Sequence, residues 1–530
     1  MLAVIVGSSL FLFVCASALL LGYLAHRHAA GSFHHQSAHD NSARVSFIAD
    51  RHDQNRSGHT QQPIRRMSGF SVFGFSFSGM GLISCACWLL LPAIGHGGPA
   101  ALGIGWPVIG LFAMLASCVY ASSAAGVPSN GGVYHWVLAT SGRRRGLLAG
   151  GFHCAGQAVL YAVTNVLAAS WLHSTLSEAF GYNATPAGHY ALLTVLFAAQ
   201  FWTSVRSPAR LGRLYAAAAW MEIAAILIMI MGLAYAAGAG YWPVQMIYGQ
   251  HHPVDVQAAG PNATSTMLGL LLLYRGLIGS ERAGGMAEET EDSRLNTPWA
   301  IFLSTVYAII FGYLFFAFLL VQIPFSPDAG GLLEGIRAIL GDGYAWLTPS
   351  VAVLVFLFTW FSGAGSLTGM ARMWYAMAQD RGVPMSDWFR IVSRHRRVPL
   401  RAHAAFVTVC AVISAVVLLV YGRNAAVTLP FQPLLLAIML LHAALVIVAG
   451  GRCAARLAGR TIAIGPWGLG RLEPWIEWLT VGWAVTCIGS SAMLVTPVGW
   501  IAIGTALLLI LLIVYGSRQV GFGTSRDSRR

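Results

Sequence analysis

The sequence predicts an all-α polytopic membrane protein. Of its 530 residues, 56% are hydrophobic and only 10% are charged, a balance that a soluble protein of this size could not bury. Apolar segments of roughly 20 residues, the length that crosses a bilayer as a helix, recur along the whole chain. Unbroken apolar runs such as Ile301–Ile323 lack the alternation of a membrane β-barrel, so the spans are helical.

The positive charge follows the pattern of a membrane protein and not that of a nucleic-acid-binding protein. The net charge is +13, and all 32 basic residues are arginine. Loops and helix ends on one side carry 28 of them, the opposite side carries Arg337 and Arg423, and two lie within spans. Cytoplasmic loops are enriched in basic residues, so we expect the core to begin and end in the cytoplasm, with a cytoplasmic C-terminus.

The apolar segments divide the chain into five parts. We expect an extra N-terminal transmembrane helix at residues 1–24, a cytoplasmic segment rich in histidine and arginine at 25–66, and a core of ten helices at 67–450. Two further helices with a preceding loop occupy 451–516, and a basic cytoplasmic tail occupies 517–530. The twelve core spans are expected at 68–92, 101–125, 147–171, 188–205, 214–238, 264–285, 298–323, 347–378, 402–421, 425–450, 474–495 and 498–516.

Two features of the N-terminal region have alternative explanations. The extra helix has no positive charge before its apolar run, so it is a poor signal peptide. A start nearer Met67 would remove it altogether. The seven histidines of 25–66 are compatible with metal binding, but a solvated linker is favoured. The eight cysteines show no zinc spacing and are expected to be buried hydrophobic residues, so we expect neither a metal nor a cofactor.

Two spans contain residues that weaken a helix inside the membrane. The first core span carries Ser78, Gly79, Met80 and Gly81, a pattern that fits either a helix break or close helix packing. The sixth span carries Gly276, Gly279 and Ser280. Breaks at matching positions of two repeats are typical of a transporter binding site, where free amides hold a carboxylate and free carbonyls hold a cation or an amine.

Two charged residues lie inside apolar spans, one in the sixth and one in the fifth. Arg275 stands deep in the sixth span, where a charge costs roughly 3 kcal/mol or more and requires a partner or water. Glu222 lies inside the fifth span. An internal ion pair of Arg275 with Glu222 or Glu281 is slightly favoured over a direct role of Arg275 in binding an acidic substrate.

Six motifs occur in order between about residues 60 and 516. They are Gly97-Gly98-Pro99-Ala100-Ala101, Pro128-Ser129-Asn130-Gly131-Gly132-Val133-Tyr134-His135-Trp136, Gly156-Gln157, Ala287-Glu288-Glu289-Thr290 with Pro298, Arg372-Met373-Trp374-Tyr375-Ala376 with Asp380 and Pro384, and Gly465-Pro466-Trp467-Gly468-Leu469-Gly470-Arg471. With these motifs the chain resembles the amino acid–polyamine–organocation superfamily, most of all the branch of GABA and choline permeases.

The resemblance implies a five-plus-five inverted repeat (a leucine-transporter-like fold) of ten helices with two more, and no enzyme activity. It implies alternating access around breaks at Ser78–Gly81 and at Gly279, Ser280 and Glu281. The sequence departs from the family where Ser280 replaces an aromatic residue and Arg275 replaces a tryptophan. With no lysine, the chain cannot place one in the fifth helix, as some superfamily members do in place of a sodium ion.

We therefore expect a secondary active transporter in the plasma membrane, driven by a proton or sodium gradient, for an amino acid, GABA, choline or a polyamine-like amine. A substrate sensor of the same fold is the alternative, and no nucleic acid is expected as a partner. Gln157 either contacts substrate or bridges helices. The expected ion or proton site consists of Glu222, Ser362, Ser366 and Thr368, although such hydroxyls often bond to their own helix. The expected cytoplasmic gate consists of Glu288, Glu289 and Arg372.

Overall fold

The protein is a bundle of helices around a central, interrupted one. The computed structural model describes residues 2–34, 66–183, 185–237, 247–249, 263–322, 347–393, 398–421 and 431–516. Within these ranges there is no β-strand, only an isolated bridge between Met67 and Thr290. Nine of the described helical spans are long and apolar enough to cross a membrane, which agrees with a polytopic membrane protein.

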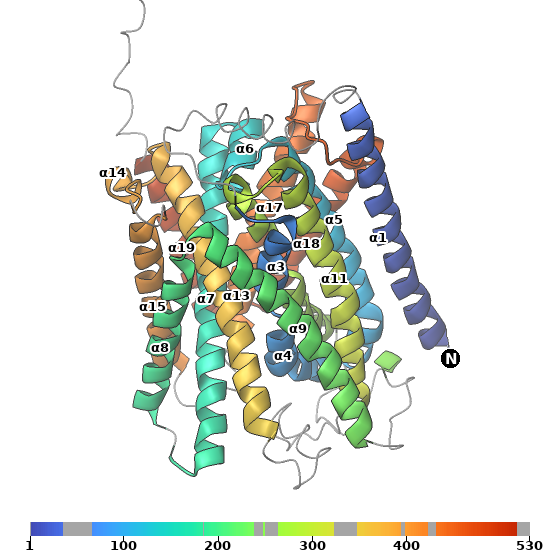
Figure 1. Cartoon of the computed structure of the whole chain (residues 1–530), viewed down its shortest axis with the longest axis vertical. Coiled ribbons are helices and arrows are strands. Elements are labelled where there is room, and N and C mark those ends of the chain that lie inside the picture. The colour runs from blue at the N-terminus through green and yellow to red at the C-terminus, as the bar shows by residue number, and fades with distance from the viewer. Residues whose placement is uncertain are drawn as a thin grey trace, which may run out of the picture.

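The long helices overlap the expected spans, with differences at several ends and interruptions in the first and sixth. They are α1 (Leu2–His34), α3 (Gly69–Met80), α4 (Leu82–Gly97), α5 (Trp106–Gly126), α7 (Arg143–Phe180), α8 (Pro186–Ser204), α9 (Pro208–Ala237), α10 (Ala263–Tyr274), α11 (Ser293–Gln322), α13 (Leu347–Gln379), α15 (Leu400–Tyr421), α17 (Phe431–Leu457), α18 (Glu473–Leu494) and α19 (Pro497–Gly516). Shorter helices are α6 (Val133–Ser141) and α14 (Ser386–Phe389). Figure 1 shows α3 inside the bundle, with α1 and α15 at opposite edges.

Glycines determine where α7 begins and ends. We expected this span at 147–171, but the helix runs from Arg143 to Phe180. Gly142, with φ of 87°, precedes it, and Gly181, with φ of 65°, follows it. Residues with side chains rarely adopt such angles, so these two glycines stop the helix and the residues between them continue it.

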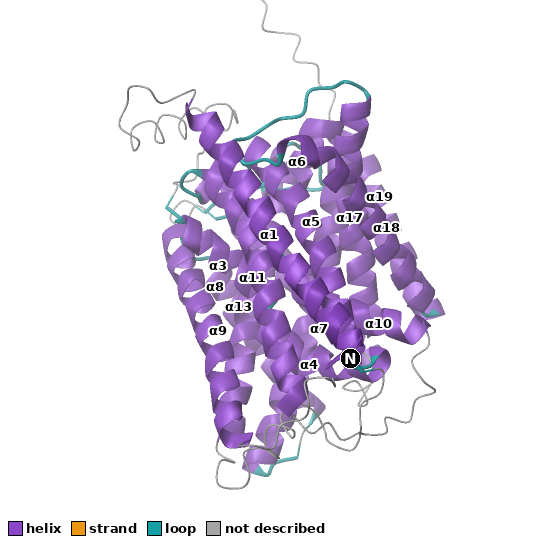
Figure 2. Ribbon diagram, turned by 90° about the vertical axis from the view of Figure 1, so that its right-hand side faces the viewer, coloured by secondary structure: helices purple, strands orange, loops and turns teal. Residues whose placement is uncertain are grey.

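The extra N-terminal helix packs against the core along one face. Its buried residues Val14, Ala18, Leu21 and Ala25 follow the spacing of three and four that brings side chains to one side of a helix. Phe11 stacks on a tyrosine of α11 with ring centroids 4.2 Å apart. Figure 2 shows α1 crossing this side of the bundle. The helix continues past the expected end at residue 24, and the histidine-rich stretch from 35 to 65 lies outside the described residues.

Helices α17 and α18 are joined by a cluster of four charged side chains. Arg452 of α17 donates to Glu477 of α18 at 2.7 Å, and Arg456 donates to Glu473 at 2.6 Å. Cross contacts complete the cluster, from Arg452 to Glu473 at 3.3 Å and from Arg456 to the second oxygen of Glu477 at 2.9 Å. Arg452 and Glu477 are almost fully buried, so each requires the other's charge.

Glu477→Ala is expected to destabilise the purified protein by about 3–5 kcal/mol, because it removes the closer and more deeply buried of the two carboxylates that pair with Arg452 and leaves only the 3.3 Å contact to Glu473. Denaturation in detergent measures this loss. The control is Asp387→Ala, which removes an exposed ion pair with Arg390 and is expected to cost at most about 1 kcal/mol. Equal stabilities of the two variants would contradict a stabilising role for the buried cluster.

Candidate functional site

The first core span is broken at Gly81. Helix α3 ends at Met80, α4 begins at Leu82, and Gly81 between them has φ of 62° and ψ of 57°. This left-handed conformation costs a residue with a side chain roughly 1–2 kcal/mol, so glycine permits the break. The other glycine of the motif, Gly79, permits close packing instead. A Cβ on Gly79 would lie 2.6 Å from Nη1 of Arg282.

The sixth span is broken over a longer stretch. Helix α10 ends at Tyr274 and is followed by one 3₁₀ turn, Arg275–Leu277. Ile278 is extended and Gly279 has φ of 134°, after which a second 3₁₀ helix, η4, runs from Ser280 to Glu289. A 3₁₀ helix of ten residues is uncommon and often accompanies function or strain.

The two breaks face each other in the interior of the bundle. A Cβ on Gly279 would lie 3.4 Å from the carbonyl carbon and oxygen of Gly79. The hydroxyl of Ser76 donates to the carbonyl oxygen of Ser280 at 2.9 Å. Ser78 and Ser280 are also buried here. The expected substrate-binding segments of the first and sixth spans are therefore in direct contact.

Charged side chains occupy the helix ends that the first break exposes. At the C-terminus of α3, Arg282 donates to the carbonyl of Gly79 at 2.6 Å, and Arg275 donates to that of Met80 at 2.9 Å. At the N-terminus of α4, the amide of Leu82 donates to Oε1 of Glu222 at 3.1 Å. Cations thus meet the negative end of one helix dipole and an acid meets the positive end of the next.

This arrangement replaces the favoured interpretation of Arg275. In the described part of the chain, no ion pair joins Arg275 to Glu222 or to Glu281; its bonded partner is a main-chain carbonyl. All three side chains are buried. The sequence indicated that these charges need partners but not that the partners are the broken backbone itself.

Gln157 connects the two charged residues that follow the second break. Its Nε2 donates to Oε1 of Glu281 at 2.8 Å, and its Oε1 accepts from Nη2 of Arg282 at 3.1 Å. The amide therefore bridges helices in this structure, one of the two roles expected for it. His153 of α7 also approaches Glu281, with its Nε2 3.9 Å from Oε1.

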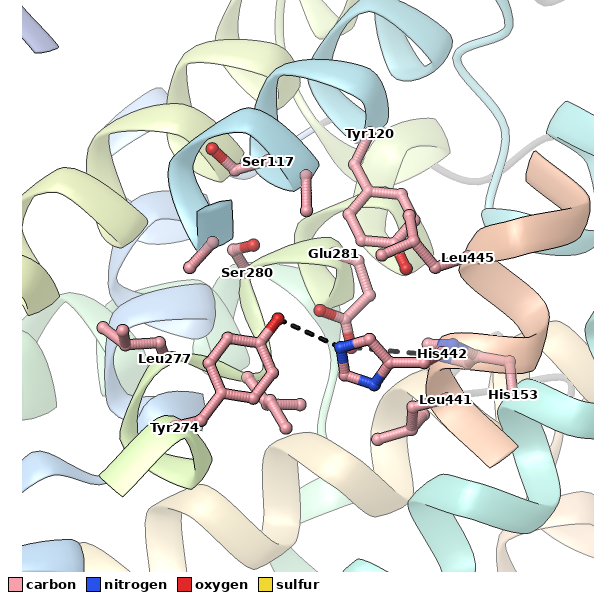
Figure 3. Close-up of a pocket in the computed structure, with 13 residues that line it drawn as sticks. Ser117, Tyr120, His153, Tyr274, Leu277, Ser280, Glu281, Leu441, His442 and Leu445 are labelled. Carbon is pink, nitrogen blue, oxygen red and sulfur yellow. Dashed lines mark hydrogen bonds and ion pairs between the residues drawn. The ribbon is translucent and has the colours of Figure 1, made fainter. Parts of the chain in front are cut away.

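A cavity lies beside this network, between α5, α7, α17 and the sixth span (Figure 3). Glu281, His153 and His442 line it together with Tyr274. Nδ1 of His442 is 2.8 Å from the carbonyl of Ile438, which only accepts, so this nitrogen carries the proton. Neutral His442 then accepts the Tyr274 hydroxyl at its other nitrogen, at 3.1 Å.

Four residues of this region were not among the expected site residues: Arg282, His153, Tyr274 and His442. Two of them left a signal in the sequence, because His153 and His442 are polar residues inside otherwise apolar spans. Arg282 lies near the end of the expected helix at 264–285, so the sequence assigned it to the arginines of the cytoplasmic helix ends and not to the interior. The non-helical break instead turns it inward.

The hydroxyls of α13 are less directly involved than expected. Ser362 donates to the carbonyl of Gly79 at 2.9 Å and thus contacts the first break. Ser366 donates to the carbonyl of Ser362 at 3.1 Å, and Thr368 to that of Ala364 at 2.7 Å. The hydrogens of these two hydroxyls are therefore used within their own helix.

Of the expected gate residues, Glu288 and Glu289 lie at the end of η4 and Arg372 lies on α13. Arg372 forms a bidentate ion pair with Glu289, at 3.0 Å from Nε to Oε1 and 2.9 Å from Nη2 to Oε2, and both side chains are buried. Glu288 has different partners: it accepts from the Ser129 hydroxyl at 2.8 Å and from the Asn130 amide at 3.1 Å.

The backbone closes the same end of the molecule. The amides of Arg66 and Met67 donate to the carbonyl of Glu289 at 2.9 and 3.0 Å, and Met67 accepts from the amide of Glu291 at 3.0 Å. The chain before α3 is thus tied to the chain after η4. Among the described residues, no group of three His, Cys, Asp or Glu could hold a metal ion.

Comparison with known proteins agrees with this architecture. The sequence profile described as amino acid permease matches residues 67–521. A rice protein (Oryza sativa subsp. japonica) named as a homolog of the amino-acid permease BAT1 is 26% identical over 459 residues, covering 81% of this chain and 85% of its own length. The amino-acid permease BAT1 of Arabidopsis thaliana is 25% identical, with the same coverage. The GABA-specific permease of Saccharomyces cerevisiae is 23% identical, covering 65% of this chain and 62% of its own.

A profile that matches most of the chain, over a helical bundle with two facing helix breaks, identifies a multi-pass membrane transporter and not an enzyme. The chain belongs to the amino acid permease family, within the amino acid–polyamine–organocation superfamily.

Proposed function

We propose that this permease is a secondary active transporter that moves an amino acid or a related amine across the plasma membrane by alternating access around the two facing breaks. The observation that carries the proposal is the contact between the two breaks. The first break, at Gly81, lies inside the 29-residue span Gly69–Gly97, and the carbonyl of Gly79 beside it lies against Gly279 of the second break. Backbone released from a helix is tolerated within a membrane only where it is buried in protein or lines a cavity. Broken helices at corresponding positions of two repeats mark the binding site of many transporters.

The relatives support the substrate class. Two are named amino-acid permeases and one is named a GABA-specific permease. An amino acid or GABA is therefore the favoured substrate, ahead of choline and polyamine-like amines. The thirteen-span topology with a five-plus-five repeat, its orientation with a cytoplasmic C-terminus, and the driving ion belong to the same proposal.

We assign the closed end of the site to the cytoplasmic side. The ion pair of Arg372 with Glu289 and the pairing of Met67 with Thr290 stand at the end of the bundle where α7 begins with Arg143, Arg144 and Arg145. The positive-inside rule places such a cluster in the cytoplasm. Alternating access then requires that the Arg372–Glu289 pair opens when the site faces inward.

Glu222 is the strongest of the expected proton-coupling residues. One carboxylate oxygen accepts from the first amide of α4, and the other is buried without a bonded partner among the described residues. A carboxyl in this position can take up a proton on the free oxygen without losing its contact to the break. We therefore propose coupling to protons at Glu222, with Ser362 as a contact to the same break.

A non-transporting sensor is the second candidate, favoured by the side chain of Arg282 between the two breaks. Uptake into proteoliposomes distinguishes the two. The purified permease is expected to accumulate a labelled amino acid or GABA against its gradient when a proton gradient is applied. Saturable binding without any uptake would identify a sensor.

Gly81→Ala is expected to reduce this uptake at least about tenfold, because an alanine favours a continuous helix and resists the left-handed conformation by roughly 1–2 kcal/mol. Gly95→Ala is the matched control: it lies on the same span, with no atom within 4 Å of the added Cβ, and is expected to transport normally. Folded yield in detergent is measured in parallel. Normal uptake by a well-folded Gly81→Ala protein would refute the role of the first break.

Glu289→Gln is expected to open the cytoplasmic end. It replaces a charge-assisted pair, typically worth about 1.5–3 kcal/mol, with weaker contacts, so the open population should rise roughly tenfold or more. The readout is the rate at which an impermeant thiol reagent labels a cysteine placed at Met286, a fully buried position, in a background without native cysteines. Glu291→Gln, at an exposed neighbouring acid, is the control. An unchanged labelling rate in Glu289→Gln would argue against this gate.

A further inference from the structure

A second cavity lies on the other side of the sixth span, and Arg275 lines it. Its walls come from α4, α7, α17 and the 3₁₀ turn that contains Arg275. Most of the lining is aliphatic, with Leu89, Leu160 and Leu434 among the residues. The polar groups that line it are therefore few, and each affects what the cavity can bind.

The charge of the cavity is positive. Arg275 is 6% exposed, and its described hydrogen bond goes to the carbonyl of Met80, which carries only a fraction of a negative charge. No acidic side chain occurs among the residues described as lining the cavity. A guanidinium has five N–H groups, so several remain for a further acceptor. A buried cation in this state gains free energy from an anionic ligand.

A second donor lines the same cavity. The indole nitrogen of Trp88 is buried and has no hydrogen-bond partner in the structure. A buried N–H without an acceptor costs about 1–3 kcal/mol, and a ligand oxygen would recover that cost. Arg275 and Trp88 therefore present unmatched donors from two separate elements, the turn after α10 and helix α4.

The two hydroxyl groups that line the cavity, those of Ser84 and Thr164, can only accept hydrogen bonds from a ligand. Thr359 donates its hydrogen to the carbonyl of Val355 at 2.8 Å, so Ser84, 2.8 Å from the Thr359 oxygen, must be the donor of that contact. Thr164 donates to the carbonyl of Leu160 at 2.7 Å. With their hydrogens used, Ser84 and Thr164 offer only lone pairs, which suit an ammonium group.

Arg282 does not provide an equivalent site. Its Nη1 and Nη2 are held by the carbonyl of Gly79 and the side chain of Gln157, its Nε is buried, and Arg282 is not among the residues that line either cavity. Arg282 fills the contact between the two breaks, whereas Arg275 lines a cavity of about 20 Å³. The second cavity is thus the place where a ligand acid group can reach a cation.

We propose that this cavity is a carboxylate subsite in which Arg275 and Trp88 hold the acid group of the substrate while Ser84 and Thr164 receive its amine. The inference rests on the proposed transport function and narrows its substrates to compounds that carry both an acid and an amine. Diamines and choline, which lack the acid, are excluded.

The test measures binding and uptake of matched ligand pairs. The ligands are the twenty amino acids and GABA, each of the best binders paired with its amide, together with putrescine and choline. Wild-type protein is expected to bind an acid-bearing ligand and to lose about 10- to 100-fold in affinity for its amide, the range expected for a bond to a charged group. Putrescine and choline are expected not to bind.

Arg275→Met keeps an unbranched apolar stem and removes the guanidinium with its charge, and is expected to weaken binding of the acid about 10- to 100-fold while removing the preference over the amide. Trp88→Phe removes the N–H and is expected to weaken binding about 3- to 10-fold. The matched control is Trp374→Phe, which removes another buried indole N–H, far from this cavity, where Trp374 packs on Phe389 and Phe406. It should bind like wild type. If Arg275→Met fails to fold, the binding of Trp88→Phe and the comparison of each acid with its amide in the wild-type protein still test the subsite.

Three results would overturn the subsite: transport of putrescine or choline with no acid-bearing substrate, an unchanged preference for the acid in Arg275→Met, or protection of the protein by chloride alone to the same extent as by the amino acid. Transport of putrescine or choline would overturn the subsite but leave the proposed transport function intact. Binding that depends on Arg275, without any uptake, would support the subsite and contradict the transport function.

Discussion

The structure depends on how the chain compensates the charge of a helix that ends inside the membrane. Ending α3 at Met80 exposes carbonyls that lipid cannot solvate. The guanidiniums of Arg275 and Arg282 bind these carbonyls, and Glu222 binds the amide that begins α4. Arg275, Arg282 and Glu222 thus each bond to the broken backbone, and each helix end at the first break bonds to side chains of opposite sign. Neither the break nor the charges would be stable without the other.

Charged side chains and backbone contacts also join the helices away from the two breaks. In the proposed alternating-access cycle, rearrangement of the two breaks would change the positions of η4 and α3, so other contacts must hold the elements around them. At one end, the pair of Arg372 with Glu289 joins α13 to η4, and the bridge of Met67 with Thr290 joins the start of α3 to the same segment. The cluster around Arg452 holds α17 against α18 independently. In the proposed cycle, the Arg372–Glu289 pair, which would open, is therefore separate from the cluster around Arg452, which would stay closed.

Apolar length predicted the helical spans, and glycine position predicted the break in the sixth span. For the first span the residues fitted either a break or close packing, and the break was implied by the resemblance to the superfamily. It predicted that Arg275 and Glu222 need partners, since the cost of a buried charge does not depend on the fold. It did not identify those partners, because a periodic pattern gives the direction of a side chain only while the helix is regular. Past Gly279 the 3₁₀ geometry turns Arg282 inward, away from the helix end where regular periodicity placed it. The pairing of Arg372 with Glu289 depends on tertiary contact between residues 83 positions apart, a separation at which spacing says nothing.

Two arginines at the end of α3 also constrain how the proposed transporter can be coupled to an ion. The carbonyls of Gly79 and Met80 already accept from guanidiniums, so a cation bound to the same oxygens would meet two like charges in a medium of low dielectric. A coupling ion therefore belongs at an acidic group, and the described break offers two: Glu222 and Glu281. Glu281 is held by Gln157 and approached by His153, whereas Glu222 has an oxygen without a partner. Protonation of Glu222 would weaken its hold on the first amide of α4 and so act directly on the break that organises the site.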